Sequence, residues 1–260
     1  MNAPDLLKRT GKGSLAYHRS DAHGDGANLP GVVFLGGFRS DMTGTKATWL
    51  EAWCQDRGRA FLRMDYTGHG ASDGDFLDGS IGDWASDAAD ALDILTNGRQ
   101  IVIGSSMGGW IALLLAKRMP ERIAGLIGIA AAPDFTEDSM WEGFSPEQRA
   151  VLQSEGQVAL PSDYSDEPYV ITRRLIEEGR ENLLLRTPLP LPMPVRLLQG
   201  TADTDVPPSV ALRLLDHIDC PDARLTLVKG ADHRFSDARE LALIGKTLHG
   251  LSRTILGEDG

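Results

Sequence analysis

One serine in the sequence has the surroundings of a nucleophile. Ser106 lies in the run from Gly104 to Gly109 (GSSMGG), which follows an apolar segment and opens a helical pattern. A serine on a tight turn between a strand and a helix exposes its hydroxyl, provided that the residues two before and two after it are very small. Gly104 and Gly108 meet this condition for Ser106, whereas Ser105 lacks such neighbours. The pattern therefore predicts Ser106 as a nucleophile for acyl transfer.

A serine hydroxyl is a weak nucleophile and needs a base beside it. Three histidines follow Ser106 in the chain, namely His217, His233 and His249. His217 and His249 lie within helical patterns, whereas His233 comes just after the apolar segment Leu225 to Val228. Sites of parallel sheets lie at the carboxyl ends of their strands. We therefore predict His233 as the general base.

The acid that orients the imidazole is expected after an earlier strand. Asp203 and Asp205 both follow the apolar segment Val195 to Leu198, and Asp203 is nearer to its end. Asp205 is placed to cap the next helix, and Asp134, which follows another predicted strand, is a third candidate. Asp203 is the predicted acid, and its role is to fix the tautomer of His233 and stabilise its charged form.

The oxyanion of a tetrahedral intermediate needs backbone N–H donors. The N–H of Met107 is one candidate, because it follows the nucleophile. The second is expected from the loop of residues 36–39, whose glycines allow close approach to a substrate, and we predict the N–H of Phe38. Arg39 is a candidate contact for an anionic substrate group, and the alternative is an exposed arginine paired with Asp41.

Short apolar segments alternate with helical patterns along most of the chain. The segments typical of strands buried on both faces are Val32 to Leu35, Ala60 to Met64, Ile101 to Ile103, Leu126 to Ala130, Val195 to Leu198 and Leu225 to Val228. The helical patterns are Lys46 to Arg57, Ile81 to Thr96, Gly109 to Met119, Pro208 to His217 and Ala238 to Leu251. This alternation predicts an α/β fold with a mostly parallel, doubly wound sheet.

Residues 133–194 interrupt the alternation for about 60 residues, too long for a structureless loop in a compact domain. The pair Ser145-Pro146 is typical of a helix start. We predict a small helical cap insertion at 133–194 on a core formed by 1–132 and 195–260. Aromatic residues of the insertion could line an acyl pocket or simply pack. They are Trp141, Phe144, Tyr164 and Tyr169.

Charge and composition argue against several classes of partner. The net charge is −11, which disfavours binding to nucleic acid and to anionic membranes. No apolar stretch is long enough to span a bilayer, so we expect no stable membrane insertion. The N-terminus lacks the apolar core of a signal peptide, which predicts a cytoplasmic protein.

The sequence predicts neither a metal nor a cofactor. Cys54 and Cys220 are too few for a zinc site or a disulfide scaffold. The run Gly68 to Asp73 lacks the third glycine of a dinucleotide fingerprint. The run Thr43 to Lys46 (TGTK) looks like part of a phosphate loop, but its first glycine is not at the required spacing.

The whole pattern resembles the α/β-hydrolase superfamily. Its landmarks are the run around Ser106, the positions of Asp203 and His233, and the run Asp65 to Ser72 (DYTGHGAS). Short stretches are similar to the branch of the mitochondrial palmitoyl-protein thioesterase, also described as an acyl-glucuronide esterase, and suggest a bacterial-type relative. These stretches are Gly44 to Ala47, Arg63 to Gly74, Gly104 to Trp110 and Leu160 to Ser165. The resemblance implies a Ser106–His233–Asp203 triad, with Phe38 and Met107 as oxyanion donors.

These residues predict a serine hydrolase that cleaves carboxylic esters or acyl thioesters through an acyl-enzyme, as a depalmitoylase-like esterase would. Its expected partner is a small-molecule ester or an acylated thiol, and the sequence leaves any protein partner unknown. The first alternative is a C–C bond hydrolase that uses the same triad on a diketone, with Arg39 holding the acidic group. The second is a non-catalytic binding member of the fold.

Overall fold

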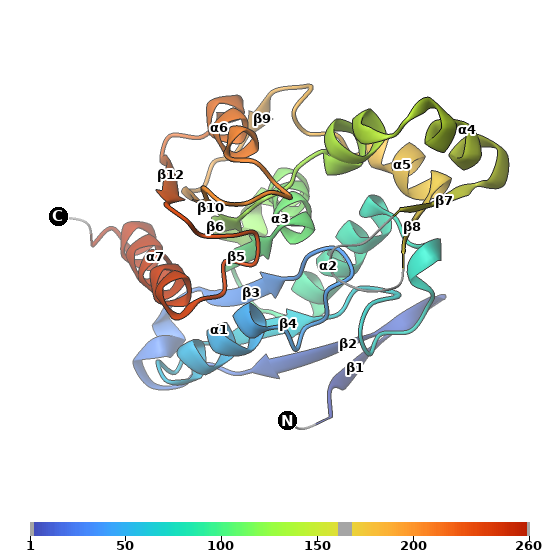
Figure 1. The fold of residues 1–260 in the computed structure, drawn as a ribbon. Coiled ribbons are helices and arrows are strands. Elements are labelled where there is room, and N and C mark those ends of the chain that lie inside the picture. Colours follow the sequence, from blue (N-terminus) through green and yellow to red (C-terminus); the bar gives the residue numbers. More distant parts are fainter. Residues whose placement is uncertain (1–2, 161–167, 259–260) are drawn as a thin grey trace.

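The computed structural model describes residues 3–160 and 168–258. Its centre is an eight-stranded sheet in the order β1-β2-β4-β3-β5-β6-β10-β12 (Figure 1). The strands from β4 to β12 in this order run parallel, as predicted. The strands are β1 (Asp5–Arg9), β2 (Lys12–Ser20), β3 (Gly31–Leu35), β4 (Phe61–Met64), β5 (Gln100–Ser105), β6 (Ile123–Ile129), β10 (Val195–Gly200) and β12 (Ala223–Val228).

The sheet separates two layers of helices. Side chains alternate along a strand, so Val32 and Phe34 of β3 pack under one layer, and Val33 and Leu35 pack under the other. Helices α1 (Thr45–Gln55) and α7 (Ala238–Leu256) form the first layer. Helices α2 (Ile81–Leu95), α3 (Met107–Arg118) and α6 (Pro208–His217) form the second. Both faces of the central strands are therefore buried, which is why these strands are continuously apolar.

An antiparallel pair at one edge of the sheet was not predicted. Strand β1 pairs with β2, and β2 pairs antiparallel with β4. Leu7 and Leu15 point into the core, while many of their neighbours on these strands are partly or fully exposed. A strand with one solvated face contains many polar residues, so this pair lacks the apolar run by which the central strands are recognised.

The described part of residues 133–194 lies against the second helix layer, and Figure 1 shows α4 and α5 at the same end of the molecule as α2. This segment contains the π-helical turn η4 (Thr136–Trp141) and the helices α4 (Pro146–Glu155) and α5 (Arg173–Arg180). It is not purely helical, because β7 (Gln157–Leu160) and β8 (Tyr169–Thr172) form an antiparallel pair. A second small sheet joins β9 (Leu189–Pro190) to β11 (Ile218–Asp219).

Short 3₁₀ turns complete the described elements: η1 (Gly24–Asn28), η2 (Phe76–Asp78) and η3 (Pro120–Arg122). Within residues 3–160 and 168–258, no helix is both long and apolar enough to cross a membrane.

Candidate active site

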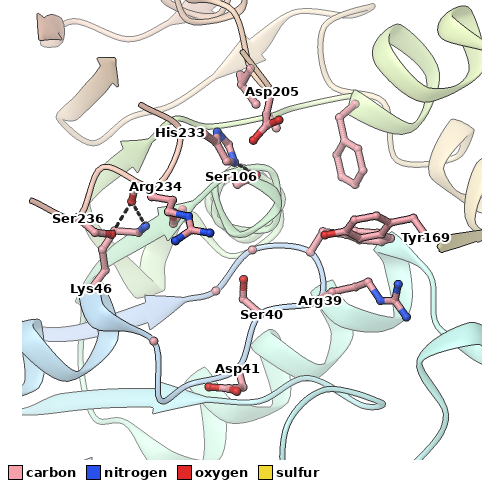
Figure 2. Close-up of a pocket in the computed structure, with 18 of the residues that line it drawn as sticks. Arg39, Ser40, Asp41, Lys46, Ser106, Tyr169, Asp205, His233, Arg234 and Ser236 are labelled. Atoms are coloured by element: carbon pink, nitrogen blue, oxygen red, sulfur yellow. Dashed lines mark hydrogen bonds between the residues drawn. The ribbon is translucent and has the colours of Figure 1, made fainter. Parts of the chain in front are cut away.

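Ser106 lies on a strained turn between β5 and α3. Its backbone has φ 55° and ψ −119°, a conformation that residues other than glycine rarely adopt. Neighbouring backbone holds it there, since the Ser106 N–H donates to the Ile129 carbonyl (2.9 Å) and the Ala132 N–H donates to the Ser106 carbonyl (3.1 Å). The turn presents the hydroxyl above the carboxyl ends of the parallel strands (Figure 2).

The glycines on either side of Ser106 are required by close backbone contacts. A Cβ atom at Gly104 would lie 2.1 Å from the Gly108 carbonyl oxygen. A Cβ atom at Gly108 would lie 2.1 Å from the carbonyl oxygen of Leu35 at the end of β3. Side chains at these two positions would push α3 away from the sheet, so the spacing of the motif follows from packing.

Gly108→Ala is expected to destabilise the fold by about 3 kcal/mol or more, because rigid backbone on β3 cannot make room for the added methyl group. The matched control is Gly250→Ala in α7, where nothing lies within 4 Å of the added Cβ atom. That change should stabilise the helix by about 1 kcal/mol. Urea unfolding of both variants measures the two effects, and equal stability of the two would contradict the packing argument.

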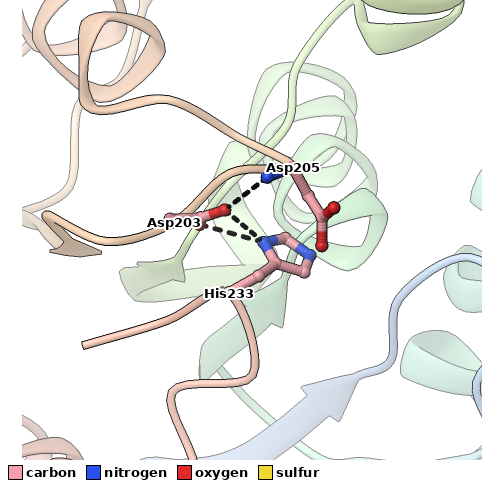
Figure 3. Close-up of side chains that lie close together, drawn as sticks. All are labelled: Asp203, Asp205 and His233. Carbon is pink, nitrogen blue, oxygen red and sulfur yellow. Dashed lines mark hydrogen bonds and ion pairs between the residues drawn. The ribbon is translucent and has the colours of Figure 1, made fainter. Parts of the chain in front are cut away.

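Three side chains from distant parts of the chain meet at this turn. The His233 Nε2 atom lies 3.1 Å from the Ser106 Oγ atom. The His233 Nδ1 atom lies 2.9 Å from Oδ2 and 3.1 Å from Oδ1 of Asp203 (Figure 3). With its proton on Nδ1, the imidazole donates to the carboxylate and accepts the serine hydroxyl proton at Nε2. This is the hydrogen-bond sequence of a nucleophile, a base and an orienting acid.

The Asp203 carboxylate is buried and accepts several hydrogen bonds. Its side chain is fully enclosed, and it accepts hydrogen bonds from the N–H groups of Val206 (2.8 Å) and Asp205 (3.0 Å) and from the Gln199 amide (2.9 Å). Burial alone would raise its pKa, but the hydrogen bonds from His233, Val206 and Gln199 outweigh burial and lower the pKa below its usual value. The group is therefore an anion at neutral pH.

The two other candidate acids have different surroundings. Asp205 is exposed beside the imidazole of His233 (Figure 3), and its backbone N–H donates to the Asp203 carboxylate. Asp134 is fully buried and accepts from the N–H groups of Leu184 (2.8 Å) and Leu185 (2.9 Å). It therefore ties the start of the inserted segment to residues in its later part, and its hydrogen bonds go to these residues and to Arg186.

Asp203, Asp205 and His233 also form the described group whose spacing would suit a metal, with ligand atoms within 4.8 Å of one another. The Asp203 oxygens and the His233 Nδ1 atom already bind each other and the neighbouring donors. The group is therefore a poor fit for an ion, because a metal would have to displace these bonds.

The predicted oxyanion donors belong to two segments that lie next to Ser106. Met107 is the first residue of α3, where a backbone N–H has no partner within its own helix. The loop before Phe38 passes close by, since a Cβ atom at Gly37 would lie 3.4 Å from the Ser106 Cβ atom. Arg39 in the same loop has φ 55°. A strained loop beside a strained serine is typical of a functional site.

Arg39 packs on aromatic rings. Its guanidinium carbon lies 5.1 Å from the centre of the Phe76 ring and 5.0 Å from that of Tyr169, and Figure 2 shows Arg39 beside Tyr169. Phe38 packs against the same two rings, at 5.0 and 6.3 Å. The Asp41 carboxylate accepts instead from its own loop, two residues on. The predicted alternative of an Arg39–Asp41 pair is therefore replaced by cation–π contacts.

A cavity of about 710 Å³ opens above Ser106 and His233, within the usual range for small-molecule sites. One end is apolar and is formed by residues of the inserted segment 133–194. Its side chains are Phe135, Met140, Leu160, Tyr169 and Ile171. We call these five residues the apolar end.

Of the four aromatic residues proposed for an acyl pocket, Tyr169 lines the cavity. Trp141 and Phe144 are not among its described lining residues and pack on each other, with ring centres 6.3 Å apart. The Trp141 ring also lies beneath two arginine side chains. Tyr164 lies outside the described residues. The sequence analysis did not predict that Leu160 and Ile171 line the cavity. The alternation of apolar and polar side chains along β7 and β8 would have been the signal.

The opposite end of the cavity is polar and cationic. Lys46 and Arg234 both line it, together with Ser236 (Figure 2). The Lys46 ammonium donates to the carbonyl oxygen of Arg234. Burial of Lys46 lowers its pKa to about 8, although Asp232 nearby favours the charged form.

The sheet order, the serine on a strand–turn–helix junction, and a chain order of serine, aspartate and histidine define an α/β-hydrolase. Residues 31–174 match the family model described as serine aminopeptidase, S33. The chain therefore belongs to the α/β-hydrolase superfamily, as its sequence motifs indicated.

Its relatives show to which members of the superfamily the chain is similar in sequence and structure. The chain is 38% identical to the mitochondrial palmitoyl-protein thioesterase ABHD10 of Rattus norvegicus over 95% of this chain and 81% of the rat protein. The crystal structure of a putative hydrolase from Agrobacterium vitis is 37% identical, with a TM-score of 0.90, over 96% of this chain and 98% of that one. Mouse α/β hydrolase domain-containing protein 10 is 35% identical, with a TM-score of 0.88, over 96% and 98%. The chain belongs to the family of these relatives, and the protein is an esterase- or thioesterase-like serine hydrolase.

The rat relative is named as a mitochondrial protein. The comparisons therefore do not support the expectation of a cytoplasmic protein.

Proposed function

We propose that this hydrolase cleaves acyl thioesters, and more slowly the corresponding carboxylic esters, with Ser106 as nucleophile, His233 as base and Asp203 as orienting acid. The observation that carries the proposal is the continuous hydrogen-bond path from Ser106 Oγ through His233 to Asp203 at the floor of a cavity with an apolar end. The relatives named as palmitoyl-protein thioesterases favour an acylated thiol as the substrate.

In the first half of the reaction, His233 Nε2 takes the Ser106 proton while Oγ attacks the acyl carbon. The carbonyl oxygen becomes an oxyanion and accepts hydrogen bonds from the N–H groups of Phe38 and Met107. The ionised Asp203 stabilises the imidazolium without taking its proton. The intermediate then collapses, the C–S or C–O bond breaks, and His233 passes its proton to the leaving thiolate or alkoxide.

In the second half, a water molecule attacks the acyl-enzyme. His233 removes a proton from this water, the bond between Ser106 Oγ and the acyl carbon breaks, and the proton returns to Oγ. The products are a carboxylic acid and the free enzyme. Both halves use the same three side chains and the same oxyanion donors, so no cofactor is needed for the atoms and charges to balance.

The apolar end of the cavity gives a reason for acyl selectivity. Met140, Leu160 and Ile171 offer apolar surface that a saturated acyl chain would cover. Each buried methylene contributes about 0.8 kcal/mol, so each added carbon should favour the substrate until the apolar end is full. We therefore propose medium- to long-chain acyl groups as substrates.

A chain-length series tests this proposal. Hydrolysis of p-nitrophenyl esters from acetate to palmitate, and of acyl thioesters of the same lengths, should show an optimum well above acetate. Met140→Trp, which fills part of the apolar end, should lower the ratio of octanoate to acetate turnover by about tenfold or more. Trp141→Phe alters the neighbouring side chain outside the cavity and should leave the ratio unchanged.

Two results would contradict the proposal. If short acetyl esters were preferred by wild type and Met140→Trp left that preference unchanged, the apolar end would not bind the acyl group. If no ester or thioester were cleaved but a vinylogous diketone were, the triad would serve C–C bond hydrolysis.

A further inference from the structure

Gln199 is a fully buried polar side chain that binds the proposed acid. It lies near the carboxyl end of β10, and its amide nitrogen donates to the Asp203 Oδ2 atom at 2.9 Å. The carbonyl oxygens of Val206 and Gly200 lie 2.9 and 3.3 Å from the same nitrogen. Three acceptor oxygens surround this atom, so the amide must present its N–H groups there and not its oxygen. Gln199 thus connects a core strand to the loop that carries Asp203.

The core alone does not explain a glutamine at this position. The Gln199 amide oxygen accepts no hydrogen bond from the described part of the chain. A buried acceptor of this kind costs free energy, and an apolar side chain of similar shape would avoid that cost. What the amide contributes therefore comes from its nitrogen, at Asp203.

The two oxygens of the Asp203 carboxylate are held differently. Oδ1 accepts from the backbone N–H groups of Asp205 and Val206. Oδ2 accepts from Gln199 and makes the shorter of the two contacts with His233 Nδ1, each at 2.9 Å (Figure 3). Backbone donors therefore fix one oxygen, while the Gln199 amide and the imidazole share the charge of the other.

This sharing affects how readily the Asp203–His233 pair takes up a proton. Burial favours the neutral form of Asp203, and its hydrogen bonds, including the one from Gln199, lower its pKa below the usual value in spite of burial. Charge that the amide takes up is also unavailable to a protonated imidazole. The imidazole must be unprotonated at Nε2 to accept the Ser106 proton, so the amide should extend activity toward lower pH.

We propose that Gln199 is a positioning residue of the catalytic site, which holds Oδ2 of Asp203 toward His233 and takes up part of its negative charge. Its side chain is fully enclosed, so it acts through Asp203 and not by touching substrate. This inference rests on the proposed function, because it concerns the same acid and base.

Gln199→Met tests the proposal, because methionine keeps the length of the side chain and removes the donor. The acidic limb of the kcat/KM profile for p-nitrophenyl octanoate should move to higher pH by about half a unit or more, a threefold or larger change in proton affinity of the pair. Oδ1 keeps its backbone donors, so kcat on the plateau should fall by less than about tenfold.

Two further variants separate the donor from the fold. Gln199→Glu restores a donor, because two carboxyl groups in contact share one proton, and its acidic limb should lie at or below the wild-type position. Gln100→Met is the matched control. Gln100 is also buried, and its amide donates to the Asn97 carbonyl at 2.7 Å. It lies at the start of β5, at the opposite end of the strand from Ser106, so stability should fall while the limb stays in place.

The other charged groups around the pair are the same in wild type and in the Gln199→Met protein. Asp205 lies beside the imidazole (Figure 3), Asp232 and Arg234 flank His233 in the chain, and Lys46 lines the same cavity. The substitution adds and removes no charge. A difference between the two profiles therefore reports the loss of the amide.

A fall in activity at every pH with an unmoved acidic limb in Gln199→Met would overturn the proposal, and so would an equal shift in Gln100→Met. Circular dichroism checks folding, and Gln199→Leu supplies a second side chain without a donor. An NMR titration of the His233 ring in Ser106→Ala, with and without Gln199→Met, measures the same shift without turnover. Absence of ester and thioester cleavage by wild type would contradict only the proposed function, so the two failures are distinguishable.

Discussion

Ser106→Ala is expected to lower kcat on every ester and thioester substrate by about 10⁵-fold or more. Without its Oγ atom no acyl-enzyme forms, and the cavity can only bind substrate near the oxyanion donors and His233. The substitution removes one oxygen from a turn held by its own backbone hydrogen bonds, so the fold should persist. Steady-state kinetics with p-nitrophenyl octanoate measures the loss, and a fluorophosphonate probe should label the wild type but not the variant.

Ser105→Ala is the matched control, because Ser105 precedes Ser106, is the last residue of β5 and also lines the cavity. Its hydroxyl is not part of the hydrogen-bond path to His233, so kcat should stay within about tenfold of wild type, and probe labelling should remain. Residual activity above about 1% of wild type in Ser106→Ala, a level far above that left by a missing nucleophile, would show that another group attacks the substrate.

Asp203→Asn is expected to lower kcat by about 10⁴-fold. An amide at this position can present an N–H to His233 Nδ1, which would then accept a hydrogen bond and leave the proton on Nε2. Nε2 could no longer take the Ser106 proton. The effect should appear in kcat with p-nitrophenyl octanoate. Asp203→Asn added to Ser106→Ala should bind octanoyl thioesters with nearly the same affinity as Ser106→Ala alone.

Asp205→Asn distinguishes the two neighbouring aspartates. Asp205 is exposed and supplies its backbone N–H to Asp203, and the amide substitution leaves that N–H in place. We expect less than about a fivefold change in kcat, as for an exposed charge near a site. If the larger loss followed Asp205→Asn instead, the orienting acid would be Asp205.

Local sequence patterns were sufficient to predict the strands and helices that form the core of the fold. The central strands and the helices between them were recognised because both faces of the sheet are covered, which makes these segments continuously apolar. The α/β-hydrolase assignment that followed is confirmed by the family model and the solved structures. The segments with mixed composition were missed, namely β1, β2, β7 and β8, because strands with a solvated face resemble loops in a single sequence.

The sequence by itself also determined the candidate chemistry. Gly104 and Gly108 identify Ser106 as the candidate nucleophile, because close backbone contacts allow only glycine two residues before and two residues after it. The placement of Asp203 and His233 at the ends of successive strands follows from the rule that parallel strands bring their carboxyl ends together. Their roles remain predictions, and the distances between their side chains are what the experiments above examine.

Only the tertiary structure decided what surrounds the nucleophile. Lys46 and Arg234 are 188 positions apart, and Leu160 and Ile171 belong to the β7–β8 pair, whose short alternation was not recognised as two strands in the sequence. Trp141 has an aromatic side chain like that of Tyr169, yet one packs beneath arginines and the other lines the cavity. Which side chains face a cavity depends on how separate elements pack, and that information is distributed over the whole chain rather than in any local run of residues.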